Sequence, residues 1–139
     1  MNTLVIDSSV IVKWLNATDE QNIEEADKIL AKALKGEIEL ITPELAKYEI
    51  GNVLLLKKKL PPNEIDLSIH ALYSYPIQFI SETENLARET YDLASALKIT
   101  YYDASFLSLT KRYGATLVTE NIKHQGKDPG IKVISLKDY

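Results

Sequence analysis

The chain begins with a stretch that decides its fold, TLVIDSSVIV at residues 3–12. Residues 3–6 are predicted to form a buried parallel strand, because apolar residues follow one another there without alternation. The carboxylate of Asp7 comes next, then two hydroxyls, and the apolar residues resume at Val10. Ligand sites of α/β proteins form just beyond the carboxyl ends of the strands. We therefore expect Asp7 at such a site.

The composition is that of an ordinary folded domain. With 139 residues, 45% of them hydrophobic and 26% charged, the chain is expected to form one domain spanning residues 1–139. The lack of cysteine and the presence of only two histidines exclude disulfides, zinc–thiolate sites and multi-histidine metal sites. No apolar run approaches the ~20 residues of a membrane span, so we expect a cytoplasmic protein without a membrane partner. The net charge of −4 argues against a generally basic nucleic-acid surface, but not against local basic patches.

Strand and helix signals alternate along the whole chain. Helical spacing of apolar residues predicts helices near 9–15, 22–35, 44–59, 65–72, 82–97 and 100–113. Short apolar runs predict strands at 3–6, 39–42, 76–80, 115–118 and 132–134. Ser81, followed three residues later by Glu84, is the signature of a capping box at the start of the fifth helix. The alternation predicts an α/β domain with a central parallel sheet of about five strands.

An acid lies on the apolar side of the helix predicted at 44–59. At 100° per residue, Glu49 falls in the middle of an apolar arc. The other members of this arc are Leu45, Ala46, Tyr48, Val53, Leu55 and Leu56. A carboxylate in a buried stripe is unfavourable unless another group pairs with it. Glu49 is therefore either half of a structural salt bridge or, as we favour, a cation ligand or catalytic acid.

Two further acids have a similar double interpretation. Asp103 lies beside Phe106 and Leu107 on its helix. An N-cap at Thr100 with Asp103 as the third-position acid would also explain this placement, at roughly 0.5–2 kcal/mol. Asp7, or one of the serines after it, is likewise a candidate N-cap of the first helix. Capping would explain Asp7 and Asp103 separately, whereas a shared site at the strand ends explains these two acids and Glu49 together.

The segment TLVTEN at residues 116–121 supplies further oxygen atoms at the end of the fourth predicted strand. Carboxylates that converge on one cleft repel one another, which raises their pKa values. A divalent cation would relieve this repulsion. Without a cysteine or histidine cluster, a site of oxygen ligands favours Mg²⁺ or Mn²⁺ over zinc. Such an ion polarises a phosphate ester and lowers the pKa of an attacking water.

Four short segments carry a family signature. They are Asp7–Ser9 (DSS), Tyr48–Leu54 (YEIGNVL), Tyr102–Phe106 (YDASF) and Leu117–Asn121 (LVTEN). Together, in this order and at this spacing, they resemble the PIN-domain ribonucleases, specifically the VapC-type toxins of VapBC toxin–antitoxin pairs, over essentially the whole chain. The resemblance implies a PIN-like three-layer α/β/α fold. It also implies that Asp7, Glu49 and Asp103 are the catalytic acids that bind the metal ion.

The resemblance extends to the residues around these acids. Ser9 would hydrogen-bond within the acidic cluster, or contact the metal or its water, and Thr119 would orient the fourth position of the site. The family usually has Asp at this fourth position, where this chain has Asn121. Glu120 carries a charge beside it, but its side chain starts one position away. This departure argues against a two-metal mechanism, while a single-metal enzyme is compatible with it.

The activity implied by the resemblance is hydrolysis of RNA phosphodiester bonds by metal-activated water, with Mg²⁺ or Mn²⁺ as the cofactor. The family also implies homodimers and a cognate VapB-type antitoxin. We expect Lys13, Arg112 and Lys123 to contact the RNA backbone. The negative net charge does not contradict an RNA substrate, because RNA meets only the local field of the cleft.

Other classes of α/β protein fit the sequence less well. A receiver domain needs a pair of acids after the first strand and an Asp at the end of the third, but serines follow Asp7, and Ser81 follows the third strand. A haloacid-dehalogenase-type phosphatase needs a second Asp two residues after the first, where this chain has Ser9. The remaining alternative is a PIN-like binding module without activity, because Asn121 replaces an acid.

Overall fold

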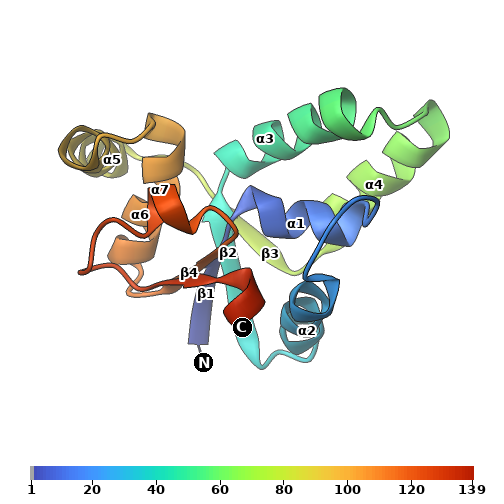
Figure 1. Ribbon diagram of the computed structural model, residues 1–139, viewed down its shortest axis with the longest axis horizontal. Helices are drawn as coiled ribbons and strands as arrows, with labels where there is room; N and C mark the ends of the chain where they lie inside the picture. Colours follow the sequence, from blue (N-terminus) through green and yellow to red (C-terminus); the bar gives the residue numbers. More distant parts are fainter. Residues whose placement is uncertain (1) are drawn as a thin grey trace.

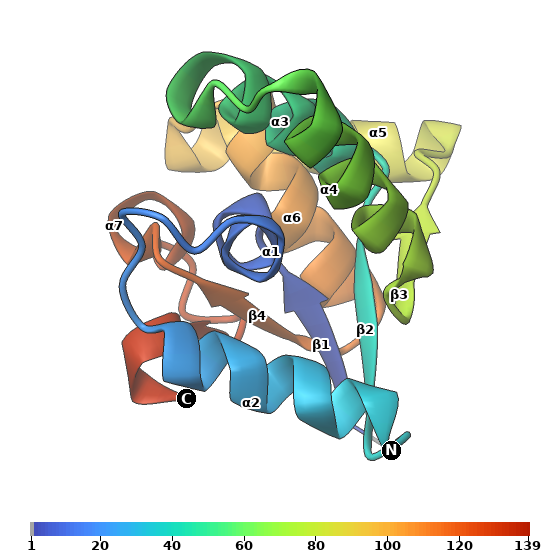
Figure 2. The same ribbon diagram turned by 90° about the vertical axis from the view of Figure 1, so that its right-hand side faces the viewer.

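The computed structural model describes residues 2–139 and contains a five-stranded sheet (Figures 1 and 2). Its strands are β1 (Asn2–Ile6), β2 (Ile38–Pro43), β3 (Ile77–Ile80), β4 (Thr116–Thr119) and β5 (Val133–Ser135). The strand order is β3-β2-β1-β4-β5, and every neighbouring pair is parallel. The α/β class and the predicted parallel sheet are therefore confirmed. The strand order reverses at β1, which places the carboxyl end of β1 where ligand sites of such sheets form.

Helices cover both faces of this sheet. They are α1 (Ser8–Leu15), α2 (Ile23–Leu34), α3 (Leu45–Val53), α4 (Pro62–Ser74), α5 (Glu84–Leu97), α6 (Tyr101–Arg112) and α7 (Ile122–Gln125), with a π-helical turn η1 (Leu54–Lys58) and a 3₁₀ turn η2 (Leu136–Asp138). Helices α1 and α2 pack on one face and α6 on the other, and α5 packs against the outside of α6 (Figures 1 and 2). This is the predicted three-layer arrangement. Within residues 2–139, no helix combines the length and the apolar character needed to cross a membrane.

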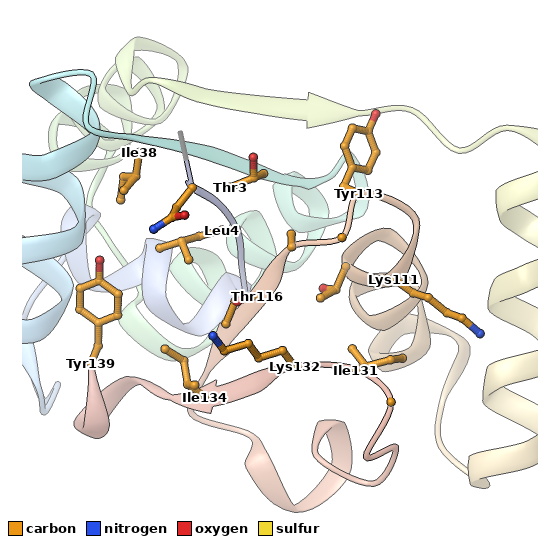
Figure 3. A pocket seen from close by; sticks show the side chains of 15 residues that line it. Thr3, Leu4, Ile38, Lys111, Tyr113, Thr116, Ile131, Lys132, Ile134 and Tyr139 are labelled. Atoms are coloured by element: carbon orange, nitrogen blue, oxygen red, sulfur yellow. The ribbon is translucent and has the colours of Figure 1, made fainter.

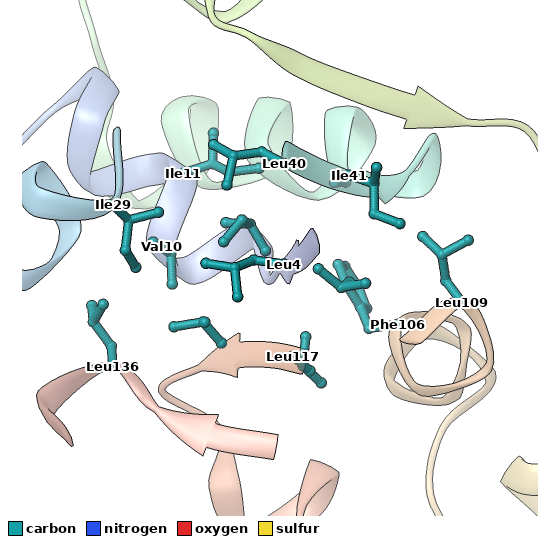
Figure 4. Packing of buried hydrophobic residues seen from close by; sticks show 14 of the residues in the cluster. Leu4, Val10, Ile11, Ile29, Leu40, Ile41, Phe106, Leu109, Leu117 and Leu136 are labelled. Carbon is teal, nitrogen blue, oxygen red and sulfur yellow. The ribbon is translucent and has the colours of Figure 1, made fainter. Parts of the chain in front are cut away.

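The central strands are buried on both faces. Val5 and Ile6 of β1 and Leu117 of β4 have no exposed surface. Helix α1 contributes Ile11 to the core from one side, and α6 contributes Phe106 from the other (Figure 4). A strand that is covered on both faces has no polar side to alternate with its apolar side. This two-sided burial explains the continuous apolar run with which the chain begins.

The helix predicted at 44–59 is regular only in its first part. Helix α3 ends at Val53, and the chain continues through the π-helical turn η1. Lys59 then ends the turn with a left-handed backbone φ of 51°. Helix α3 runs alongside α1 and extends beyond the sheet (Figure 1). Only a narrow side of this helix therefore meets the core.

The apolar arc predicted on this helix is not a buried stripe. The residues that face the core are Ala46, Ile50 and Leu54, whereas Tyr48, Leu55 and Leu56 are exposed. The prediction that Glu49 lies in the middle of a buried stripe was wrong, because this part of the helix has no second layer above it. Glu49 is half-buried at the edge of the core.

The helix caps confirm one prediction and correct another. Thr100 caps α6, since its hydroxyl oxygen accepts a hydrogen bond from the N–H of Asp103 at 3.0 Å. The capping box predicted for Ser81 and Glu84 was wrong. Thr83 is the N-cap of α5, and its hydroxyl accepts from the N–H of Leu86 at 3.2 Å. The short α7 and η2 were not predicted, because a single helical turn shows no periodicity in the sequence.

Replacing Thr83 with Ala should lower the free energy of unfolding by about 0.5–2 kcal/mol, since the start of α5 loses its side-chain acceptor. The matched control Ser81→Ala should change it by less than about 0.5 kcal/mol, because Ser81 is exposed and precedes the helix. Urea unfolding followed by circular dichroism measures both values. A larger loss for Ser81→Ala than for Thr83→Ala would contradict this assignment of the cap.

Candidate active site

Asp7 joins the central strand to the first helix. Its backbone N–H donates to the carbonyl of Val118 on β4 at 3.1 Å, so the backbone at this point is tied to the neighbouring strand. Its side chain is buried and caps α1, accepting from the N–H of Ser9 at 3.3 Å and from the Ser9 hydroxyl at 2.6 Å. Capping and site formation are therefore not alternatives for Asp7. The same hydrogen bonds that cap the helix fix the direction of the carboxylate.

Glu49 and Asp103 reach the same place from two other helices. Glu49 lies in the middle of α3, and its carboxylate accepts a hydrogen bond from the Ser8 hydroxyl at 2.8 Å. Asp103 lies in the first turn of α6 and is half-buried. Strand β1 leads directly into α1, and β2 into α3, at one end of the sheet (Figure 1). Ser8 was not among the predicted site residues, although its position beside Asp7 could have suggested a role.

The three acids line a single cavity of about 550 Å³, which we call the acid cleft. Its lining includes Asp7, Ser8, Ser9, Asp19, Glu20, Glu49, Lys57, Lys58, Asp103, Glu120 and Asn121. The structure thus brings together the predicted acids Asp7, Glu49 and Asp103 at the carboxyl end of β1. Most of the other lining groups are also polar or charged, which suits a charged ligand better than an apolar one.

A larger cavity of about 760 Å³ lies at the opposite end of the sheet. Thr3 and Thr116 line it from the amino-terminal parts of β1 and β4, with Lys132 and Tyr139 from the end of the chain (Figure 3). Among the described residues, its lining contains no carboxylate and no histidine side chain. Size alone would select this cavity, but the chemistry expected at the strand ends belongs to the acid cleft.

Two acids of the cleft, Asp7 and Glu49, are difficult to ionise. Burial raises the pKa of Asp7, and repulsion by Asp103 raises it further, although hydrogen bonds from Ser9 and Thr119 partly offset this shift. Burial also raises the pKa of Glu49, against the hydrogen bond from Ser8, and repulsion by Asp7 and Asp103 adds to the shift. The three carboxylates are therefore close enough to influence one another electrostatically. A cation that entered the cleft would lower these pKa values.

The chemistry of these donors fits a hard divalent cation. Within residues 2–139, however, no three Asp, Glu or His side chains lie close enough together to form a preassembled metal site. Mg²⁺ is commonly held by one or two carboxylates, and waters complete its octahedral shell. Asp7 with one of the other two acids would satisfy this requirement. The side chains that could hold such an ion are Asp7, Glu49 and Asp103.

The fourth position lies at the end of β4. Thr119 is fully buried, and its hydroxyl oxygen accepts from the N–H of Asn121 at 2.9 Å. Asn121 precedes α7 as its N-cap and lines the acid cleft together with the three acids. Glu120 also lines the cleft, but its carboxylate binds the ammonium of Lys13 at 2.9 Å. Glu120 is therefore already paired with a cation of the protein.

A chain of ion pairs borders the acid cleft, and the sequence analysis did not predict it. The Lys13 ammonium lies 2.9 Å from both Glu20 and Glu120, and the second oxygen of Glu20 lies 2.8 Å from Lys58. The Lys13 side chain is only 1% exposed. Burial alone would lower the pKa of Lys13, but its two carboxylate partners outweigh burial and raise it. These pairs tie the loop after α1 and the end of β4 to the rim of the cleft.

The RNA contact predicted for Lys13 was wrong, whereas those of Arg112 and Lys123 stay predictions. Lys13 is buried and fully engaged in the ion pairs described above. Arg112 pairs with Glu89 at 2.8 Å, and neither it nor Lys123 lines the acid cleft. The lysines that line the cleft are Lys57 and Lys58. A lysine within an apolar helix start should have been read as a buried, paired cation, because unpaired lysine is almost never buried.

The comparisons with known proteins identify the family of this chain. The family model of the PIN domain matches residues 4–127, and the chain therefore belongs to the PIN-domain family. This confirms the resemblance found in the sequence. A search of curated protein sequences gave no significant match.

Several solved structures share the fold. FitAcB from Neisseria gonorrhoeae has a TM-score of 0.75 at 14% identity, covering 98% of this chain and 99% of that one. VapBC2 from Rickettsia felis, solved with a DNA fragment from its promoter, has a TM-score of 0.69 at 17% identity, covering 96% and 98%. VapC20 from Mycobacterium tuberculosis, a toxin that cleaves the sarcin–ricin loop, has a TM-score of 0.64 at 13% identity, covering 82% and 86%. At these identities the likeness shows a common fold.

Replacing Asp7 with Asn should stabilise the protein at neutral pH. Because burial raises the pKa of Asp7, the native state holds more protons than the unfolded state between the ordinary value of 3.8 and the raised one. Stability then decreases as the pH rises through this window. Asn caps helices about as well as Asp, so the variant removes the charge and keeps the cap.

Urea unfolding of the metal-free protein at several pH values measures this effect. The gain from Asp7→Asn should be largest near pH 7.5 and should shrink as the pH falls toward 4. The exposed Asp66→Asn serves as the control and should show no such trend. If wild type were the more stable protein at neutral pH and lost this advantage in acid, the Asp7 carboxylate would be a stabilising ion instead.

Proposed function

We propose that this protein is a metal-dependent endoribonuclease, the VapC-type toxin of a toxin–antitoxin pair, which hydrolyses RNA phosphodiester bonds. The observation that carries the proposal is the convergence of Asp7, Glu49 and Asp103 from three different elements on one cleft of a PIN-family fold. The fold relative VapC20 is a toxin that cleaves the sarcin–ricin loop, which supports RNA as the substrate. The electronegative cleft and its oxygen donors fit the binding of a divalent cation that in turn binds phosphate.

Asp7 would hold Mg²⁺ or Mn²⁺ together with Glu49 or Asp103. When bound, such an ion polarises the scissile phosphate and lowers the pKa of an attacking water. The serines after β1 hold the acids in place: Ser9 binds Asp7 at 2.6 Å, and Ser8 binds Glu49 at 2.8 Å. Asp7 and Glu49 therefore keep their orientation before substrate arrives, which lowers the cost of reorganisation during the reaction.

A single metal ion suits this cleft better than two. Asn121 has a neutral amide oxygen at the position where a carboxylate would strengthen the binding of a second metal ion. Glu120 does not replace it, because its carboxylate is bound to Lys13. Asp7, Glu49 and Asp103 have no lysine or arginine partner among the described residues, so these three acids, unlike Glu20 and Glu120, are free to bind the ion.

The partners follow from the same family. We propose a cognate VapB-type antitoxin, because the fold relative from Rickettsia felis is a VapBC complex. A homodimer is expected from the family resemblance. With RNA as substrate and an antitoxin as partner, we propose that the protein acts in the cytoplasm.

A second candidate function is a PIN-like binding module without activity. Asn121 is the observation that favours it, since it removes one carboxylate from the family's usual set. Such a module would keep the fold and the cleft, but would bind RNA or a protein without cleaving it.

RNA cleavage by the purified protein separates the two functions. With Mn²⁺ or Mg²⁺, wild type should cleave RNA, and Asp7→Asn should be at least about a hundredfold slower, because a carboxylate that holds the metal is lost. The control Asp66→Asn should cleave as wild type does. Equal cleavage by wild type and Asp7→Asn would remove Asp7 from catalysis. No cleavage by wild type across varied RNAs would favour the binding module.

Mn²⁺ should raise the melting temperature of the protein without RNA, because a ligand that binds only the folded state stabilises it. At a concentration of one hundred times its Kd, the expected gain is about 2.7 kcal/mol. Differential scanning fluorimetry with increasing Mn²⁺ measures the shift, and Asp103→Asn should reduce it. An unchanged melting temperature in millimolar Mn²⁺ would contradict a metal site in the acid cleft.

A further inference from the structure

One side of the helix that carries Glu49 continues along the acid cleft. Glu49, Val53 and Lys57 follow one another at intervals of four residues, and all three line the cleft. Residues at this spacing share one face of a helix. This side of the helix therefore carries the Glu49 carboxylate near the strand ends and the Lys57 ammonium in η1.

Two neighbouring lysines of η1 line the cleft, but they differ in their contacts. Lys58 is 9% exposed, donates to the backbone carbonyl of Thr18, and pairs with Glu20 at 2.8 Å. Lys57 is exposed, and none of the ion pairs or side-chain hydrogen bonds within residues 2–139 involves it. The Lys58 ammonium is already paired within the protein, whereas the Lys57 ammonium is available to a ligand.

The charge of the cleft makes this free cation important. Its other free charges are carboxylates, which repel the phosphates of a nucleic acid at every point except at a bound metal. Lys57 is the one cation in the described lining of the cleft without a carboxylate partner. A polyanion that lies along the cleft would therefore gain most by placing a phosphate beside Lys57.

The separation between Lys57 and the acids indicates which phosphate of the RNA Lys57 would bind. Lys57 lies eight positions after Glu49, which corresponds to no more than about 12 Å along a helix axis at 1.5 Å per residue, part of the stretch being the π-helical turn η1. This separation favours a phosphate beside the scissile one over the scissile phosphate itself. We propose that Lys57 binds a backbone phosphate of the RNA that flanks the scissile phosphate, and so sets the position of the strand along the cleft. This inference rests on the proposed ribonuclease activity.

RNA binding to the inactive Asp7→Asn protein tests the contact. With a fluorescent single-stranded RNA and Mg²⁺, the additional Lys57→Ala change should weaken binding about two- to fivefold at low salt. It should also reduce the slope of log affinity against log salt by about 0.7, the value for one phosphate contact on a single strand. The matched control is Lys111→Ala, which removes the same charge at the opposite end of the sheet and should change neither value.

Neutral methylphosphonate linkages, placed one at a time on either side of the cleavage site, locate the phosphate. A neutral linkage at one flanking position should weaken binding to the Asp7→Asn protein. The same linkage should cause no further loss of affinity in the protein that carries both Asp7→Asn and Lys57→Ala. In the active protein, Lys57→Ala should raise KM and leave kcat unchanged.

Two results would overturn the inference while leaving the ribonuclease intact. In the first, Lys57→Ala matches its parent in affinity and salt slope. In the second, Lys111→Ala weakens binding equally, which would show an effect of net charge alone. Failure of wild type to bind or cleave any RNA would overturn the proposed function together with this contact.

Discussion

The burial of the Asp7 carboxylate is the constraint on which the rest of the site depends. A carboxylate at the end of a buried strand must be hydrogen-bonded, and the Ser9 hydroxyl meets this need at 2.6 Å. The same contact caps α1 and so fixes how the chain leaves the sheet. Ser8 then points its hydroxyl toward Glu49, which ties α3 to the same place. One short turn thus gives both the direction of the first helix and the arrangement of two acids.

Apart from the exposed Asp19, the acid cleft contains two kinds of acid, and their partners distinguish them. Glu20 and Glu120 are paired with lysines, so their charges are neutralised within the protein. Asp7, Glu49 and Asp103 are held by hydroxyls or helix ends, and their mutual repulsion is left uncompensated. Natural proteins keep such unfavourable clusters mainly where function requires them. The unpaired acids are therefore the ones that we assign to the metal ion.

The sequence predicted the sheet well, because buried parallel strands leave continuous apolar runs such as residues 3–6. It also predicted the three acids, although for Glu49 the reason was partly wrong, since the residues around it on α3 are exposed. The sequence did not predict side-chain partners that lie far apart along the chain. Nothing in the local pattern around Lys13 shows that Glu20 and Glu120 will meet there, because the contact to Glu120 spans more than a hundred residues. The π-helical turn at η1 was not predicted either. The four-residue spacing that places Glu49 and Lys57 on one side of the helix could, however, be read from the sequence.

Carboxyl-carbon NMR titration of the metal-free protein tests most directly whether Asp7, Glu49 and Asp103 act as one electrostatic unit. The pKa of Glu49 should lie above its ordinary value of 4.5. The substitution Asp103→Asn should lower it, because a neighbouring negative charge is removed. Mg²⁺ should lower the pKa values of both Asp7 and Glu49. A Glu49 pKa that responds neither to Asp103→Asn nor to Mg²⁺ would show three separate acids and contradict a shared metal site.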